Sequence, residues 1–334
     1  MSAGAGTRPG DVVGYYVHHV GRGHLHRATA LAEHLAATGG PALTGLSSLP
    51  RPARWPGDWV ELPLDDGDEP ASPTARGRLH WAPLHHDGLR DRSAAVSAWI
   101  ARARPRAVVV DVSVEMVLLV RLHGVPVVSV VLPGRRDDAP HLLGFEAADV
   151  LVGFWPAQAH DMLHGVPFET KDRLHCVGAL SRFAVAESSQ DAPRRTGRHA
   201  VLLAGAGGHA PLPAAPGAWT WTVLAGDGWV EDPFSLLLSA DVVVTHAGQN
   251  ALAETAAARR PAVVVPQARP HDEQATTGSV LREGGWPAVV LDAWPTDDEA
   301  LEKAAVLDGR DWAGWCDGRA VDRFAEVVLG VVAR

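Results

Sequence analysis

The sequence predicts an α/β fold of two domains, each built on a parallel sheet with helices on both faces. Continuous apolar runs such as 107–112 and 241–245 are typical of strands that are buried on both faces. A helix-length segment separates each of these runs from the next, as a right-handed βαβ unit requires. The length of 334 residues suits two domains of ordinary size.

Composition excludes several classes of protein. A net charge of -9 argues against nonspecific nucleic-acid binding, and we expect no nucleic-acid partner. Cys176 and Cys316 lie far apart and have no metal-site spacing, which suits a reducing compartment. The sequence has neither an apolar secretory core at its start nor an apolar run long enough to span a membrane. We therefore expect a cytoplasmic protein.

The first strand, 11–17, leads into a glycine-containing loop, 18–24, and then a helix that ends at Thr38-Gly39-Gly40. This order is typical of a ligand-binding βα junction. The glycine spacing differs from Gly-x-Gly-x-x-Gly, so a nicotinamide cofactor is not expected. His24 stands at the helix start, where the dipole disfavours imidazolium and keeps the ring able to accept a proton. A histidine that only hydrogen-bonds the turn is the alternative.

A strand at 42–46 is followed by long loops over 49–92, with an extended piece at 58–62, and then by a helix at 91–104. Loops on a rigid scaffold commonly carry specificity, so Trp81 and His85 are candidates for binding an acceptor, as is His19 in the first loop. Scattered surface aromatics, or for His19 a buried strand end, are the alternatives.

The apolar strand 107–112 contains Asp111 near its carboxyl end, at the sheet edge that also holds His24. A helix at 114–123 and strands at 126–131 and 148–154 follow. A carboxylate behind an imidazole fixes its tautomer and stabilises the imidazolium, so Asp111 is a candidate orienting residue. The alternative is an aspartate that caps the next helix.

The second half begins after a polar linker. A strand at 199–204 runs into glycines that include Gly207 and Gly208, whose backbone can approach a diphosphate closely. Another βαβ unit follows over 241–285. At its strand ends, helix N–H groups and the positive dipole end favour phosphate. The candidate donors for phosphate there are His246, Gly248 with its backbone, Gln249 and Asn250. Glu254, about two turns on, can reach a diol such as ribose.

These motifs resemble those of GT-B glycosyltransferases. The series His246-Ala-Gly248-Gln249-Asn250, then Glu254, then Glu273-Gln274 is similar to the donor signature of plant and antibiotic-pathway UDP- or dTDP-sugar transferases and of the peptidoglycan N-acetylglucosaminyl transferase. The resemblance implies that His246 contacts diphosphate, Glu254 ribose, Glu273 and Gln274 the donor sugar, and the Trp229-Val230 region the base. Ala251, where many members carry Ser or Thr, and Thr277, where some carry Asn, depart from the pattern.

The first domain carries a matching signature. Gly21-x-Gly23-His24-x-x-Arg27 is similar to the amino-terminal motif of the same families. In the plant-type and antibiotic-pathway enzymes the histidine corresponding to His24 is the general base, and in the plant-type enzymes an aspartate orients it. The resemblance implies a GT-B fold, two Rossmann-like domains facing across a cleft. The expected divisions are an acceptor-binding domain at 1–183, a linker at 184–198, a nucleotide-sugar domain at 199–316, and at 317–334 a helix that crosses back to the first domain.

The expected function is inverting, metal-independent transfer of a sugar from a UDP sugar, or a dTDP sugar, to a hydroxyl, with no cofactor. The acceptor is a small molecule or a lipid-linked one, and peripheral membrane contact and a monomeric or homodimeric state stay open. Two alternatives remain. One is a nucleotide-sugar hydrolase in which His24 activates water, as in the similar hydrolase of the pseudaminic-acid pathway. The other is a noncatalytic nucleotide-sugar-binding subunit.

Overall fold

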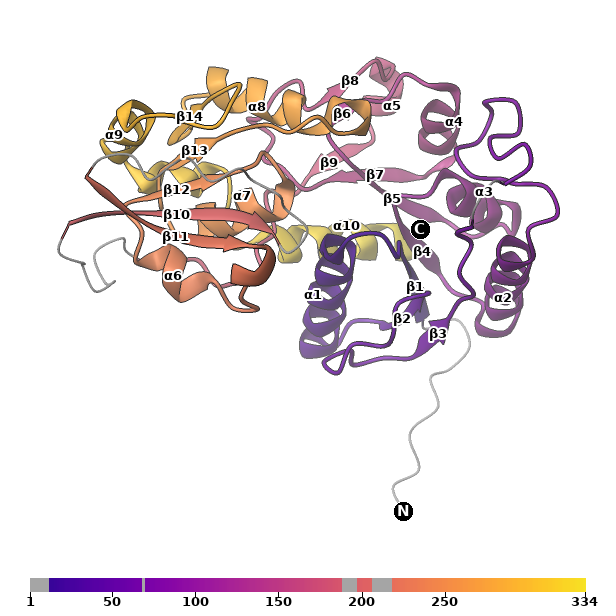
Figure 1. Cartoon of the computed structure of the whole chain (residues 1–334). Coiled ribbons are helices and arrows are strands. Elements are labelled where there is room, and N and C mark those ends of the chain that lie inside the picture. The colour runs from indigo at the N-terminus through magenta and orange to yellow at the C-terminus, as the bar shows by residue number, and fades with distance from the viewer. Residues whose placement is uncertain (1–11, 68–69, 188–196, 206–217) are drawn as a thin grey trace.

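The computed structural model describes residues 12–67, 70–187, 197–205 and 218–334. They form two α/β domains, each with its own parallel sheet, side by side in Figure 1. The predicted fold class is confirmed. Gly207 and Gly208, and most of the predicted linker, lie outside the described residues.

The first domain is built on a seven-stranded parallel sheet in the order β3-β2-β1-β4-β5-β7-β9. Its strands are β1 (Val12–Val17), β2 (Ala42–Ser47), β3 (Trp59–Glu61), β4 (Ala107–Asp111), β5 (Val127–Val131), β7 (Val150–Gly153) and β9 (Leu174–Cys176). In the pairing of β1 with β4, Val17 lies opposite Asp111. The carboxyl end of β1, from which the His24 loop departs, therefore adjoins the carboxyl end of β4.

The helices of the described part of this domain are α1 (Arg22–Thr38), α2 (Asp87–Ala103), α3 (Val114–Leu122), α4 (Ala139–Ala147) and α5 (Phe168–Lys171). A small parallel pair, β6 (Gly134–Arg135) and β8 (Leu163–His164), stands apart from the main sheet. Helix α1 buries Ala28, Leu31 and Leu35 against the sheet. It ends where Gly39 takes a left-handed φ of 72°, which glycine adopts without steric cost.

The second domain has a five-stranded parallel sheet in the order β11-β10-β12-β13-β14. Its strands are β10 (Arg198–Gly205), β11 (Trp219–Ala225), β12 (Val242–Thr245), β13 (Ala262–Val264) and β14 (Ala288–Val290). Its helical segments are η1 (Gly226–Gly228), α6 (Phe234–Leu238), α7 (Gln249–Ala257), η2 (Pro270–Asp272), α8 (Glu273–Glu283), α9 (Glu299–Ala305) and η3 (Gly309–Gly314). The strand pairings of both sheets are parallel, so the βα loops gather at their carboxyl edges.

The last helix, α10 (Ala320–Val332), packs on the first domain although it follows the second domain in the chain. Phe324 and Val328 are buried in one core with Val13 and Tyr15 of β1. Figure 1 shows α10 beside α1 and β4. The chain therefore crosses between the domains twice. After the second crossing, α10 packs against the first domain.

Several elements differ from the predicted ones. Helix α2 begins four residues before the predicted start, because the His86 side chain accepts a hydrogen bond from the Leu89 amide and caps it. The helix expected from about His271 begins at Glu273 instead, since His271 and Asp272 have left-handed φ values of 59° and 57°. Helices α4 and α9 and strand β14 were not predicted. Among the described residues, no helix combines the length and apolarity needed to cross a membrane.

Candidate active site

His24 and Asp111 are in direct contact. His24 lies in the first turn of α1 and Asp111 ends β4, and the His24 Nδ1 atom is 2.8 Å from Asp111 Oδ1. Asp111 is fully buried. A carboxylate only accepts hydrogen bonds, so the tautomer with a proton on Nδ1 donates to Asp111 and leaves Nε2 as a base.

Arg27 and Tyr15 also donate hydrogen bonds to the Asp111 carboxylate. Arg27 donates from Nε to Oδ2 at 3.1 Å and from Nη2 to Oδ1 at 3.0 Å, and the Tyr15 hydroxyl donates to Oδ2 at 3.0 Å. Burial alone would raise the pKa of Asp111, but the charge of Arg27, with a smaller effect of His24, holds that pKa well below its usual range. Asp111 is therefore ionised.

Arg27 Nη2 is also 2.8 Å from His24 Nδ1. A guanidinium only donates, so a hydrogen bond between these two atoms would need the other tautomer, in which Nδ1 carries no proton and cannot donate to Asp111. Arg27 follows His24 by three residues, so both face the same side of α1. This spacing indicates that Arg27 lies beside His24. The bidentate contact of Arg27 with Asp111 depends on tertiary structure and could not be predicted from spacing.

The two domains meet at this point. Arg27 Nη1 donates to Gln249 Oε1 of α7 at 3.4 Å. A Cβ atom on Gly23 would lie 2.6 Å from Asn250 Nδ2, so glycine permits the close approach of the two loops. The structure thus brings the first-domain motif against the helix start of the second domain.

A cavity of about 560 Å³ opens between the two motifs. The residues predicted from the sequence to act in catalysis or donor binding that line it are His24, Trp229, His246, Gly248, Gln249, Asn250, Glu254, Glu273 and Gln274. Val230 is exposed and does not line the cavity, whereas its neighbours Trp229 and Glu231 do. Three motifs distant in sequence therefore form one site.

The N-terminus of α7 faces this cavity, and no side chain of the described residues caps it. Gly248 is the N-cap residue, and among residues 12–67, 70–187, 197–205 and 218–334 no side-chain capping bond forms there. Unpaired amides and the positive end of the helix dipole favour an anion here.

His246, just after β12, has a defined tautomer. Its Nδ1 atom is 2.9 Å from the carbonyl oxygen of Val265, which only accepts, so Nδ1 carries the proton. Burial lowers the pKa of His246, only partly offset by this hydrogen bond. Its Nε2 atom is buried and has no hydrogen-bond partner among the described residues. The sequence predicts a donor here, but Nε2 of the neutral ring is an acceptor and becomes a donor only when the ring is protonated.

Glu254 is buried in α7 and pairs with Arg182, whose Nε donates to Oε1 at 2.8 Å. Burial raises the pKa of Glu254, and Arg182 counteracts part of that effect. Arg182 lies at the predicted end of the first domain, which was placed at residue 183. Its contact with Glu254 crosses from the first domain to the second and could not be read from spacing.

Glu273 and Gln274 begin α8. Glu273 Oε1 accepts from Arg136 Nη2 of the first domain at 2.7 Å. Gln274 Oε1 accepts from the Gln267 amide at 2.9 Å, which leaves its amide nitrogen to donate. The pair therefore offers one paired carboxylate and one donor to the cavity.

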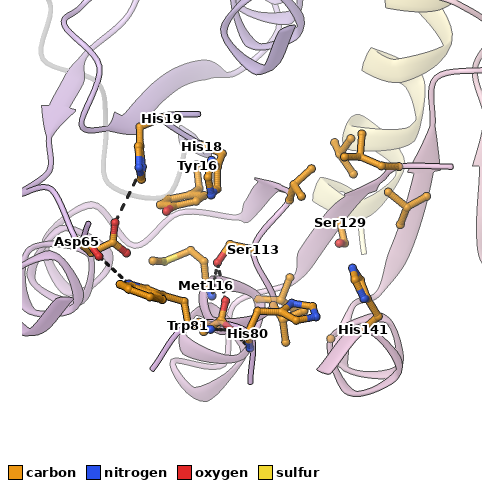
Figure 2. A pocket seen from close by; sticks show the side chains of 18 of the residues that line it. Tyr16, His18, His19, Asp65, His80, Trp81, Ser113, Met116, Ser129 and His141 are labelled. Atoms are coloured by element: carbon orange, nitrogen blue, oxygen red, sulfur yellow. Dashed lines mark hydrogen bonds and ion pairs between the residues drawn. The ribbon is translucent and has the colours of Figure 1, made fainter. Parts of the chain in front are cut away.

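A second cavity, of about 500 Å³, is lined mainly by residues of the first domain, together with His271 and Glu273 of the second, and is shown in Figure 2. We call it the first-domain cavity. His19 and Trp81 line it, and the Trp81 indole donates to the Asp65 carbonyl at 2.6 Å. Val114, Val131 and Phe145 belong to its apolar wall. His85 is exposed and does not line it. His18, stacked on His19, also reaches to within 5.8 Å of His24, measured between ring centroids.

Comparisons with known proteins support one interpretation. Residues 232–279 match the family described as "Glycosyltransferase family 28 C-terminal domain". The MurG structure from Acinetobacter baumannii is 14% identical with a TM-score of 0.61, and covers 96% of this chain and 99% of its own.

The glycotransferase of kitacinnamycin is 19% identical with a TM-score of 0.62, over 96% of this chain and 99% of its own. CalG4, the calicheamicin glycosyltransferase, is 17% identical with a TM-score of 0.62, and the match covers 96% of this chain and 98% of CalG4. The chain has the GT-B fold. Together, the family 28 segment and the fold support a glycosyltransferase. No curated protein sequence matches the chain.

Proposed function

We propose that the protein transfers a sugar, with inversion, from a nucleoside diphosphate sugar to a hydroxyl acceptor, with His24 as the general base. The observation that carries the proposal is the convergence of the His24–Asp111 pair and the uncapped α7 N-terminus on one cavity. A base and an anion site that face one cavity are what attack at an anomeric carbon with a diphosphate leaving group requires.

The proposed reaction balances on these groups. His24 Nε2 takes the proton of the acceptor hydroxyl, and the resulting oxygen attacks the anomeric carbon from the face opposite the diphosphate. The bond from that carbon to the phosphate oxygen breaks, and its electron pair leaves with the diphosphate. Asp111, ionised and buried, stabilises the imidazolium, and amides at the start of α7 stabilise the diphosphate charge.

The donor is proposed to be a UDP sugar, with dTDP as the alternative. Glu254 would accept from ribose hydroxyls, and Glu273 and Gln274 would contact the sugar. Metal independence is proposed because the buried Glu254 and the half-buried Glu273 already pair with Arg182 and Arg136. Cytoplasmic localisation and a monomeric or homodimeric state remain predictions.

The acceptor is proposed to occupy the first-domain cavity, which His18 lines; the centroid of the His18 ring is 5.8 Å from that of the proposed base, His24. A volume of about 500 Å³ with an apolar wall suits an organic acceptor larger than water. This cavity favours transfer over hydrolysis, for which water alone would have to reach His24.

A panel of nucleotide sugars tests the proposal. We expect one UDP or dTDP sugar to raise the unfolding temperature of the protein most. With that donor, release of the nucleoside diphosphate should require an alcohol acceptor. Equal release with and without an acceptor would instead identify a hydrolase, and binding without release under either condition would identify a noncatalytic subunit.

A further inference from the structure

Three histidines and one aspartate gather at the edge of the first-domain cavity. Figure 2 shows His80 and His141 among the side chains of this cavity. His80 comes from the loop before α2, Asp138 and His141 from the start of α4, and His271 from η2 of the second domain. One ligand atom of each lies within 4.8 Å of those of the other three. We call these four residues the histidine cluster.

Asp138 is at the centre of the histidine cluster. Its Oδ1 atom is 2.9 Å from His80 Nε2, and its Oδ2 atom is 2.5 Å from His141 Nδ1 and 3.8 Å from His271 Nδ1. Ligands that are each about 2.0–2.1 Å from a tetrahedral zinc ion are roughly 3.3 Å from one another. The largest separation of 4.8 Å therefore exceeds that spacing by only about 1.5 Å, a difference that side-chain rotation can close.

We propose that the histidine cluster binds one zinc ion. Three imidazoles and one carboxylate are the ligand types that zinc takes in proteins, and they suit zinc better than magnesium or calcium, which prefer all-oxygen sites. The carboxylate also offsets part of the charge of the ion.

The protonation of the rings agrees with this assignment. Burial lowers the pKa of His141 to about 4, although the hydrogen bond with Asp138 opposes the shift. Burial is also the main cause of the lowered pKa of His271. Neutral imidazoles keep a lone pair for a metal.

Arg136 contacts His141, and zinc binding would break this contact. Its Nη1 atom is 3.2 Å from His141 Nε2 and donates to it, so His141 Nδ1 carries the proton before metal binds. Coordination through Nδ1 moves this proton to Nε2 and breaks the contact with Arg136. Arg136 keeps its bonds to the Pro133 carbonyl at 2.8 Å and to Glu273 at 2.7 Å, so its charge stays paired.

The zinc ion would join the two domains. His271 precedes Glu273 by two residues, and both His271 and Asp272 have left-handed φ values that shape the turn. A Cβ atom on Gly134 would lie 2.2 Å from the His271 carbonyl oxygen, so the first domain packs directly on this turn. A zinc clamp here would fix the start of α8, where Glu273 and Gln274 face the other cavity.

The test is calorimetric titration of the metal-stripped, tag-free, full-length protein with zinc, with no nucleotide sugar present, so that its result is independent of the proposed transfer. We expect one zinc ion per chain. His80→Ala and His271→Gly should each weaken zinc binding by about tenfold or more, since even outer partners of zinc ligands contribute about 10–100-fold. Glycine tolerates the positive φ of His271. His160→Ala, an exposed histidine outside the cluster, should bind zinc as the wild type does.

Unfolding curves without zinc separate a lost ligand from a damaged fold. Zinc should raise the unfolding temperature of the wild type more than that of either variant. If His271→Gly does not fold, His80→Ala decides the outcome. Unchanged zinc affinity in the variants that fold, or wild-type binding only at millimolar zinc, would overturn the proposal. A thiolate band in the spectrum of the cobalt-substituted protein would overturn it too, because it would place the metal on Cys176 or Cys316.

Discussion

Asp111→Asn should destabilise the first domain as well as impair the proposed base. Asp111 is fully buried and accepts hydrogen bonds from Tyr15 and Arg27, and Arg27 itself is only 5% exposed. Asparagine keeps one acceptor oxygen but leaves a buried guanidinium without its carboxylate. Breaking one half of a buried ion pair costs about 3–5 kcal/mol. Neither partner is exposed enough for solvent screening to reduce this figure. At about 2–4 °C per kcal/mol, the unfolding temperature should fall by roughly 6–20 °C.

The assay is urea and thermal unfolding at pH 7, with the double variant Arg27→Met, Asp111→Asn as the matched control. The double variant removes both charges, so it should be more stable than Asp111→Asn alone. Because the pKa of folded Asp111 is held below its ordinary value of 3.8, its contribution is present above that pH. It is lost as the pH falls toward the folded-state pKa, so the gap to wild type should shrink below about pH 3.8. A loss under about 1 kcal/mol at pH 7, or a double variant no more stable than the single one, would refute this account of the pair.

Three further predictions concern the nucleotide site. Glu254→Gln should raise the Kd of UDP about tenfold or more, because a charge-assisted hydrogen bond contributes about 1.5–3 kcal/mol; calorimetry that finds equal affinity would remove Glu254 from the ribose site. Since the pKa of free His246 is lowered and a phosphate beside Nε2 would raise it, UDP binding should take up a proton and strengthen as the pH falls. Binding heats that do not depend on the ionisation enthalpy of the buffer would contradict this. Saturating UDP should also reduce the radius of gyration measured by solution scattering, because donor residues and His24 lie on different domains; an identical profile would count against closure.

The strands were predictable because their apolar runs are long and unbroken. The segments 107–111 and 242–245 are buried on both faces of parallel sheets, so hydrophobicity alone marks them. Helix α4 was not predicted, because Pro140 and Gly144 within it are typical of loops. Its start depends on the Asp138 side chain, which accepts from the His141 amide, and proline is tolerated in a first helical turn.

Local motifs predicted which residues line the donor cavity, but not which pairs they form. His24 and Asp111 were paired through the rule that parallel strands share a carboxyl edge. The contacts of Arg182 with Glu254 and of Arg136 with Glu273 join residues 72 and 137 positions apart. Sequence periodicity indicates which residues share a face of one helix or strand, but not which residues so far apart in sequence are in contact. The histidine cluster, whose members extend from His80 to His271, was missed for the same reason.

The central claim, that His24 is the base of a sugar transfer, is tested most directly by measuring UDP affinity and acceptor-dependent nucleotide release in His24→Ala, with His18→Ala as the neighbouring control. The account predicts that His24→Ala binds UDP nearly as the wild type does and turns over about 10²–10⁴-fold more slowly, the usual contribution of a positioned base. His18→Ala should retain far more activity. Release by His24→Ala at the wild-type rate would contradict the account and place the base elsewhere.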